Sequence, residues 1–274
     1  MRMAQKRNQR IGVFDSGLGG LFTLRALVRE LPAYDYVYVG DTKRVPYGNR
    51  SPEAVYEFTR EAVKYLLQEQ QCKIVILACN TASALALRRL QQEFLPKHFP
   101  NRRVLGVLVP LAEAVQEKKI QRVGVLATHA TVQSHAIGRE LLKHFPRMKV
   151  FERAAPLLVP LIESGELRWV SGILAAYLKP LLQKNIDCIA LGCTHYPILK
   201  RAIRHVVGPG IAVISQDEFL GGKLADYLVR HPDMEQSLSR GGHRLIYVTD
   251  KTPEFEKRAS QWFGKDTKLQ VIDL

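Results

Sequence analysis

The sequence predicts an α/β fold with mainly parallel sheets, and three observations support this prediction. Short apolar, β-branched runs alternate with longer segments of helical period along the whole chain. A layout of strand, cysteine, polar residues and helix occurs twice, and its two cysteines, Cys79 and Cys193, are 114 residues apart. A chain of 274 residues is long enough for one large domain or two small ones. The repeated layout favours two half-chains built alike.

The expected strands are short apolar runs that end in a small or polar residue. They cover 10–14, 36–39, 73–77, 103–107, 122–126, 149–151, 187–191, 211–214 and 244–248. The expected helices show apolar residues at helical spacing, and one more helix is expected after the glycine loop that follows the first strand. They cover 52–69, 82–94, 131–145, 166–184 and 254–263. Proline and glycine near 101–103 and 208–210 predict the crossings between domains.

Composition and cysteine usage limit the class of protein. The hydrophobic fraction of 46% and the charged fraction of 24% are ordinary for a globular protein, and no apolar run approaches the length of a membrane span. The basic first ten residues are expected to form a polar tail. The apolar segment after them breaks at Asp15, so we expect no signal peptide and a cytoplasmic protein. Four cysteines without a C-x-x-C pair argue against structural zinc and favour free thiols.

The formal net charge of +14 makes nucleic acid the first partner to consider. The basic residues are scattered along the chain, however, mostly on the polar faces of expected helices. There is no zinc-finger spacing and no RNP-like aromatic stretch. Specific nucleic-acid binding is therefore the less favoured interpretation, and a solvated basic surface that attracts an anionic substrate is favoured.

Cys79 and Cys193 each follow an apolar strand and precede polar residues and a helix. In open α/β sheets, sites form at the carboxyl ends of strands, where loops meet helix N-termini. The helix dipole is expected to lower the pKa of such a thiol from about 8.5. One such cysteine alone is more simply a small apolar residue at a strand end, but two equivalent ones favour a shared function. Cys72 and Cys188 lie at strand starts without polar neighbours and are expected to be inert.

Two other loops follow strands, and neither identifies a chemistry alone. The loop 15–20 does not complete a dinucleotide-binding motif, because Phe22 stands where G-x-G-x-x-G requires its last glycine. Its N–H groups can hold a carboxylate, and Asp15 taken alone is most simply a helix N-cap. The stretch 41–48 predicts an ordered turn.

Three kinds of cysteine enzyme are considered for a thiol at a strand end. A phosphatase loop C-x5-R is excluded, because Leu85 and Leu199 occupy the arginine positions. A Cys/His hydrolase built on Cys193 and His195 leaves the second equivalent cysteine without a role. Two opposed thiols suit the inversion of a stereocentre, since a thiolate can remove a proton from one face while a thiol returns one to the other. No organic cofactor is then obligatory, provided that donors stabilise the carbanion-like transition state.

Four stretches together resemble the glutamate racemases of the aspartate/glutamate racemase superfamily. They are Asp15-Ser16-Gly17, Pro46-Tyr47-Gly48, Cys79-Asn80-Thr81-Ala82-Ser83 and Gly192-Cys193-Thr194-His195-Tyr196-Pro197. The likeness covers nearly the whole chain from Ile11. It implies interconversion of L- and D-glutamate without an organic cofactor or a metal, supplying D-glutamate for bacterial peptidoglycan. It also implies that Cys79 and Cys193 are the two acid/base residues, acting on the D- and the L-enantiomer respectively.

The resemblance assigns further residues and a domain arrangement. Asp15 is expected to support Cys79, and His195 with Glu163 is expected to support Cys193. The expected substrate contacts are Asp15, Ser16, Tyr47, Gly48, Asn80, Thr81, Thr131, Thr194 and His195. The family fold implies two similar doubly wound α/β domains with the active site in the cleft between them. One is formed by 1–101 with 212–274, and the other by 102–211.

Some points stay open at the level of sequence. The stretch Val213-Ile214-Ser215-Gln216 departs from the resemblance, because many relatives carry an Asp-Ser pair there, and this leaves local packing or dimer geometry open. A homodimer is left open, because the oligomeric state varies among relatives. Three alternative functions remain. They are a racemase of aspartate or another small amino acid, a basic nucleic-acid-binding or regulatory protein on the same scaffold, and a Cys/His hydrolase that uses Cys193.

Overall fold

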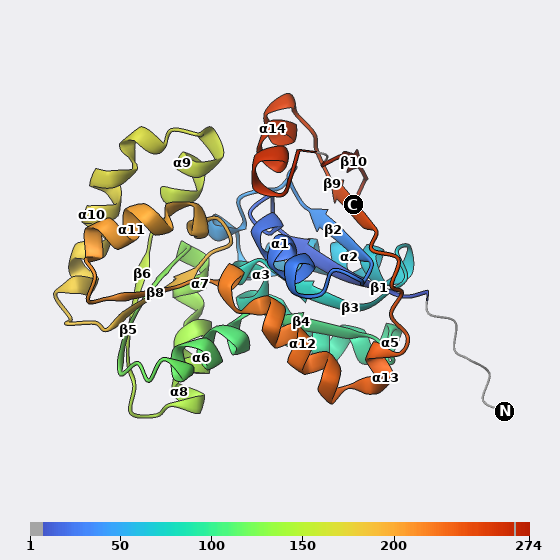
Figure 1. Ribbon diagram of the computed structural model, residues 1–274, viewed down its shortest axis with the longest axis horizontal. Coiled ribbons are helices and arrows are strands. Elements are labelled where there is room, and N and C mark those ends of the chain that lie inside the picture. The colour runs from blue at the N-terminus through green and yellow to red at the C-terminus, as the bar shows by residue number, and fades with distance from the viewer. Residues whose placement is uncertain (1–7, 266) are drawn as a thin grey trace.

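A computed structural model describes residues 8–265 and 267–274, so most of the basic N-terminal tail lies outside the described residues. The chain forms two β-sheets that lie beside one another, each surrounded by helices (Figure 1). Neighbouring strands are parallel in every pair of both sheets. The predicted α/β class with mainly parallel sheets is therefore confirmed.

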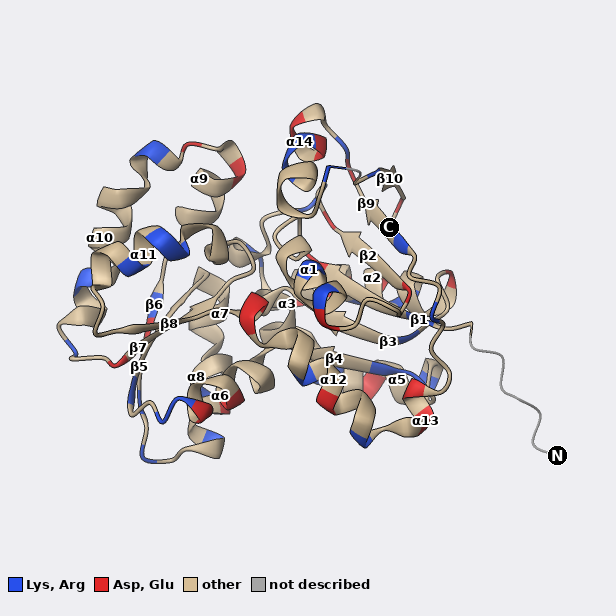
Figure 2. Cartoon of the chain, viewed as in Figure 1, with Lys and Arg blue, Asp and Glu red and all other residues tan. Residues whose placement is uncertain are grey.

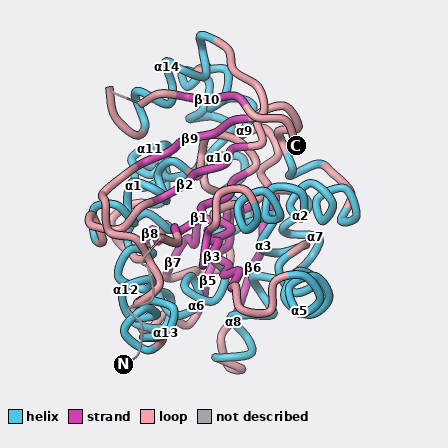
Figure 3. The backbone as a smooth tube through the Cα atoms, turned by 90° about the vertical axis from the view of Figure 1, so that its right-hand side faces the viewer, coloured by secondary structure: helices cyan, strands magenta, loops and turns pink. Residues whose placement is uncertain are grey.

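The larger sheet has six strands. They are β1 (Arg10–Asp15), β2 (Tyr36–Gly40), β3 (Cys72–Leu77), β4 (Arg103–Gly106), β9 (Arg244–Val248) and β10 (Leu269–Val271). Their order is β10-β9-β2-β1-β3-β4. Figure 3 shows β10, β9, β2, β1 and β3 of this sheet one after another. The smaller sheet has the order β6-β5-β7-β8. Its strands are β5 (Arg122–Ala127), β6 (Lys149–Ala154), β7 (Cys188–Gly192) and β8 (Ala212–Ile214). All nine expected strands are present, and only the three-residue β10 was not expected.

The helices connect the parallel strands. They are α1 (Leu21–Glu30), α2 (Pro52–Gln68), α3 (Asn80–Leu85), α4 (Leu87–Arg89), α5 (Leu95–His98), α6 (Leu108–Glu117), α7 (His129–Ser134), α8 (Ala136–His144), α9 (Leu158–Ser164), α10 (Val170–Leu182), α11 (Lys200–Val207), α12 (Leu220–Arg230), α13 (Pro232–Glu235) and α14 (Pro253–Trp262). A π-helical segment, Leu90–Phe94, follows α4.

Two expected helices are interrupted. The segment 82–94 breaks at Ala86 and continues through the π-helical segment. The segment 131–145 is split between α7 and α8 by His135, whose φ of 50° is left-handed. A pattern of apolar residues does not reveal either break. The ranges of α5, α6, α9, α11, α12 and α13 were not among the expected helices. In α6 and α9 a proline, Pro110 or Pro160, obscured the pattern, although proline is tolerated in the first turn of a helix.

Both sheets are buried on both faces. On β1, Val13 and Phe14 enter different hydrophobic clusters, and so do Val125 and Leu126 on β5. Because successive side chains of a strand point to opposite faces, each sheet packs against helices on two sides. The carboxyl ends of the strands are thus left to the loops, and these loops build the site.

The chain changes sheets a few residues later than the expected domain limits. β4 still pairs with β3 of the larger sheet, and β8 still pairs with β7 of the smaller one. The crossings therefore come after Gly106 and after Ile214, rather than at 101–103 and 208–210. The proline and glycine at the expected positions lie between a helix and the strand that follows it instead.

Charged residues are spread over both halves of the molecule. Figure 2 shows lysine and arginine, interspersed with aspartate and glutamate, on the half that contains the larger sheet and on the half that contains the smaller one. In the described part of the chain, none of the helices is long and apolar enough to cross a membrane.

Candidate active site

Cys79 lies where β3 gives way to α3 and is the N-cap residue of that helix. The backbone N–H of Ala82 donates to Cys79 Sγ at 3.5 Å, and Ser16 Oγ lies 3.4 Å from the same sulfur. The thiol is therefore fixed by a helix N-terminus on one side and by the loop after β1 on the other. The strand-to-helix position predicted for Cys79 is confirmed.

The predicted direction of the pKa shift is wrong for Cys79. Burial, with the nearby Asp15 carboxylate, raises the pKa of Cys79 to about 12. The helix α3 has only six residues and the cysteine is 5% exposed, so loss of hydration outweighs the helix N-terminus. Burial also raises the pKa of Cys72 and of Cys188 to about 12 each. Position in the fold, rather than pKa, distinguishes Cys79 from these two.

Cys193 follows β7 in the smaller sheet, and His195 comes two residues later. His195 Nδ1 lies 3.9 Å from Cys193 Sγ. The other ring nitrogen, Nε2, lies 2.5 Å from Oε1 of Glu163 at the end of α9. The Cys193 thiol, the His195 imidazole and the Glu163 carboxylate thus form a row, in which each group contacts the next.

A fourth side chain, Arg258 on α14, extends this row. Its guanidinium donates to Glu163 Oε2 at 3.1 Å. Burial opposes charge on Glu163, but His195 and Arg258 together lower the pKa of that carboxyl. Burial also opposes charge on His195, yet its bonds to Cys193 and Glu163 raise the pKa of the imidazole well above its ordinary value. Sequence reasoning missed Arg258, because nothing in the helical pattern of 254–263 points toward the cysteine motifs.

Asp15 is fully buried at the end of β1 and does not cap α1, whose N-cap is Gly20. Its Oδ2 accepts the N–H of Gly17 at 3.1 Å, and its Oδ1 accepts the hydroxyl of Thr194 at 3.1 Å. Burial raises the pKa of Asp15, and the charge on His195 opposes the rise. The loop therefore holds the side chain of Asp15 and ties it to the motif that contains Cys193.

Glycine at 19 lets the loop after β1 approach the smaller sheet. A Cβ at this position would lie 2.6 Å from His195 Nδ1 and 2.7 Å from Thr194 Oγ1. Such separations are far inside van der Waals contact, so only glycine fits against the unshifted His195 ring. The close packing of this loop on His195 and Thr194 therefore requires glycine at position 19.

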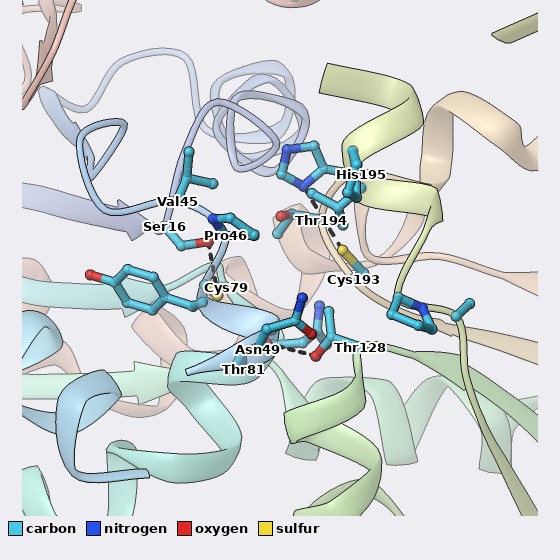
Figure 4. A pocket seen from close by; sticks show the side chains of 17 residues that line it. Ser16, Val45, Pro46, Asn49, Cys79, Thr81, Thr128, Cys193, Thr194 and His195 are labelled. Carbon is cyan, nitrogen blue, oxygen red and sulfur yellow. Dashed lines mark hydrogen bonds between the residues drawn. The ribbon is translucent and has the colours of Figure 1, made fainter. Parts of the chain in front are cut away.

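The loops that follow β1, β2, β3, β5, β6 and β7 enclose a cavity between the two sheets. Figure 4 shows Cys79 and Cys193 on opposite sides of it. It is lined by Ser16, Val45, Pro46, Tyr47, Gly48, Asn49, Cys79, Asn80, Thr81, Thr128, Ala155, Pro156, Val159, Pro160, Cys193, Thr194 and His195. No lysine or arginine is among these described lining residues, and no described group of His, Cys, Asp or Glu side chains could hold a metal ion.

Most of the expected contact residues line this cavity, but three expected site residues lie behind it. Asp15 bonds to Thr194, Glu163 bonds to His195, and Thr131 bonds to Thr81. The lining residues that sequence reasoning missed are Val45, Pro46, Asn49, Thr128, Ala155, Pro156, Val159 and Pro160. Thr128 directly follows β5, so the rule that sites form at strand ends could have found it.

Three threonine hydroxyls join the two halves beside the cavity. Thr81 Oγ1, at the start of α3, lies 3.0 Å from Thr128 Oγ1 and 3.1 Å from Thr131 Oγ1. The last two, both at the start of α7, are 2.9 Å apart. Because a hydroxyl has one donor and two acceptor positions, rotation of one member can release a donor toward a ligand.

Gln216, in the stretch that departs from the pattern of many relatives, bonds to a residue of the cavity. Its Nε2 donates to Asn80 Oδ1 at 2.6 Å, and both residues are buried. Within the described residues, Asn80 Nδ2 and Gln216 Oε1 have no hydrogen-bond partner. The bond between Gln216 and Asn80 therefore lies directly behind a residue that lines the cavity.

Comparison with known proteins decides the family. A family model described as Asp/Glu/Hydantoin racemase matches residues 11–216. The chain belongs to this racemase family. A glutamate racemase from Ruegeria pomeroyi is 39% identical, over 93% of this chain and 97% of its own length. The relationship predicted from the four motifs is confirmed, and this racemase is an isomerase of amino acids.

Solved structures show the same fold as this racemase. A glutamate racemase from Bacillus anthracis matches with a TM-score of 0.88 at 32% identity, and the match covers 98% of each chain. A glutamate racemase from Francisella tularensis, solved in complex with D-glutamate, matches with a TM-score of 0.86 at 31% identity. That match covers 97% of this chain and 98% of the other. The arrangement of two parallel sheets around a central cavity is the racemase fold.

Proposed function

We propose that this racemase interconverts L- and D-glutamate by proton transfer at Cα between two cysteines and without a cofactor. The observation that carries the proposal is the placement of Cys79 and Cys193 on opposite sides of one cavity, at strand ends of different sheets. Glutamate racemases share 38–39% sequence identity with this chain over nearly its whole length, and this similarity supports glutamate as the substrate. D-Glutamate then serves peptidoglycan synthesis, and the need for two reduced thiols favours the cytoplasm.

The reaction takes two proton transfers. In the direction from L-glutamate, the Cys193 thiolate removes the Cα proton and becomes a thiol, and the electron pair stays on the substrate. The Cys79 thiol then donates its proton to the opposite face and becomes a thiolate, which completes the inversion. From D-glutamate the same steps run in reverse, and exchange of protons with water restores the starting state.

The surroundings of the cavity suit this chemistry. The raised pKa of Cys79 keeps that thiol protonated at neutral pH, as a proton donor requires. Neutral donors at the cavity, the amide of Asn80 and the hydroxyls of Thr81 and Thr128, are the groups we propose to hold the substrate carboxylates. A buried set of such donors stabilises developing negative charge on the substrate carboxylate without rearranging.

We further propose that each sheet with its helices forms one domain and that the substrate binds in the cavity between the two domains. The limits are then 1–106 with 215–274 for the first domain and 107–214 for the second, adjusted from the expected ones to follow the sheets. A homodimer stays a proposal, and light scattering at several protein concentrations tests it.

The test of the reaction is to incubate L-glutamate with the protein in D2O. We expect loss of circular dichroism and the appearance of deuterium at Cα in the proton NMR spectrum. Cys79→Ala and Cys193→Ala should each abolish racemisation, and undiminished turnover in either variant would exclude the two-cysteine mechanism. Running the assay on L-aspartate and other small amino acids tests the nearest alternative. Salt-dependent DNA binding without racemisation would favour the nucleic-acid-binding alternative.

A further inference from the structure

The C-terminal helix α14 reaches across the molecule to the residues behind Cys193. It lies between β9 and β10, two strands of the larger sheet, whereas Glu163 and His195 belong to the smaller-sheet half. Arg258, on the second turn of α14, is 7% exposed. Its NH1 bonds to Glu163 Oε2 at 3.1 Å, and its NH2 bonds to Glu254 Oε1 at 3.2 Å. One side chain therefore links the two halves at a buried position.

The carboxylate of Glu163 is fixed at both of its oxygens. Oε1 accepts from His195 Nε2, and Oε2 accepts from Arg258. A carboxylate held at one oxygen only can rotate about its terminal torsion, which has broad wells. Held at both, it can present Oε1 to the imidazole in only one orientation. Since the opposite nitrogen of His195 faces Cys193 Sγ, the orientation of the carboxylate sets the orientation of the imidazole beside the thiol.

A second residue of the same helix face also contacts this row. Trp262 follows Arg258 by one helical turn, and its ring meets the His195 ring edge-on, with centroids 6.1 Å apart. Phe22 of α1 packs against Trp262 from the larger-sheet half, at 5.4 Å between centroids. Residues i and i+4 of α14 thus hold the Glu163–His195 pair from two directions.

We propose that Arg258 is a positioning residue for the Cys193 half of the site and acts through Glu163 and His195. It touches neither the cavity nor the thiol. This proposal rests on the proposed glutamate racemase activity, and it adds that attachment of α14 to α9 is a condition for aligning His195 with Cys193.

The first experiment compares Arg258→Met, which keeps most of the volume without the charge, with Arg258→Lys and Glu254→Gln. We expect kcat/KM to fall by about tenfold to a hundredfold in Arg258→Met, in keeping with a misplaced catalytic group. The fall should be mainly in kcat, because no substrate contact is lost. Lysine should restore part of the activity. Glu254→Gln should change kcat/KM less than twofold, since Glu254 is exposed and does not touch Glu163.

One comparison separates positioning from a merely structural role, and a thermodynamic constraint checks the kinetics on which it depends. L- and D-glutamate have equal free energies, so kcat/KM must fall by the same factor in both directions, which checks the kinetics internally. Adding Arg258→Met to Glu163→Gln should cost little more than Glu163→Gln alone, because both remove the same connection. Independent losses that multiply would overturn the proposal, and so would wild-type kcat in Arg258→Met.

A measurement that needs no activity keeps this test distinct from that of the proposed function. In protein labelled with 15N-histidine, the ring signals of His195 are identified by their absence in His195→Asn. We expect them to shift in Arg258→Met and to stay in place in Glu254→Gln. Unshifted His195 signals in Arg258→Met would refute the positioning role. If the wild-type protein fails to racemise glutamate while the His195 signals still shift in Arg258→Met, only the proposed substrate is refuted.

Discussion

Replacement of Gln216 tests how the site is supported from behind. Gln216 lies just after β8, in a short 3-10 helix of residues Gln216–Glu218. It is 3% exposed and Asn80 is 1% exposed, and the bond from Gln216 Nε2 to Asn80 Oδ1 is 2.6 Å long. Because this bond takes up the oxygen of the Asn80 amide, the free NH2 of that amide is the end left for a substrate carboxylate. Gln216→Met removes the donor while keeping a similar volume.

The expected size of the effect follows from burial. Without Gln216 Nε2, the oxygen of Asn80 becomes a buried acceptor without a partner, which costs about 1–3 kcal/mol of unfolding free energy. Gln216→Ser loses the same bond and also leaves a space, so it should be destabilised more than Gln216→Met. An Asn80 amide free to turn should weaken substrate binding, and we expect KM to rise about tenfold, which corresponds to about 1.4 kcal/mol.

The assay combines steady-state kinetics in both directions with urea unfolding. Gln91→Met is the matched control, because Gln91 also donates one amide hydrogen bond, to the carbonyl of Val104 at 2.8 Å, but does not line the catalytic cavity. It should lose some stability and keep the wild-type KM. An unchanged KM in Gln216→Met, with a stability loss below about 0.5 kcal/mol, would refute the argument that Gln216 orients Asn80.

Three further outcomes follow from the site. Gly19→Ala places a methyl group 2.6 Å from His195 Nδ1 and should reduce kcat at least tenfold. Gly172→Ala, which meets nothing within 4 Å on helix α10, should instead stabilise the fold by about 0.5–1 kcal/mol. A wild-type kcat in Gly19→Ala would contradict the close packing. Thr128→Val should raise KM more than Thr131→Val, because Thr128 alone of the two lines the cavity, and equal KM values would count against this. The Glu163–His195 pair should contribute most stability between about pH 4.5 and 6.5. Above that range the contribution falls as pH rises through the raised pKa of His195, and below it the contribution falls as pH drops through the lowered pKa of Glu163. The difference in unfolding free energy between wild type and Glu163→Gln measures this, and a difference independent of pH would refute it.

The strands of this protein were predictable from runs of apolar, β-branched residues, and the two cysteines were predictable from their position at strand ends. Each buried run of β-branched residues became a strand, and the two cysteines at strand ends lie on the cavity, as parallel sheets require. Helices were harder to predict. A proline in the first turn concealed α6 and α9, and the left-handed His135 split a helix whose apolar pattern is continuous. These are local backbone features that hydrophobic periodicity does not encode.

The supporting residues could not be predicted for a different reason. Arg258 and Gln216 acquire their contacts only when segments distant in sequence meet, and the helical pattern around Arg258 gives no sign of its contact. The direction of the pKa shift of Cys79 was predicted wrongly for the same reason. Its helix N-terminus is visible in the sequence, but the burial that outweighs it depends on how the loop after β1 packs on the sulfur.

Sequence made Cys79 and Cys193 look equivalent, yet the structure surrounds them differently. A two-cysteine racemase must carry one proton between its sulfurs, because two thiols have no base and two thiolates have no acid. Cys79 lies in a buried, anionic environment near Asp15, which favours the neutral thiol. Cys193 faces His195, whose positive charge is sustained by Glu163, and Arg258 in turn compensates the charge of Glu163. The two halves of the fold thus surround the two cysteines differently, and the difference comes from side chains outside both cysteine motifs, among them Asp15, Glu163 and Arg258.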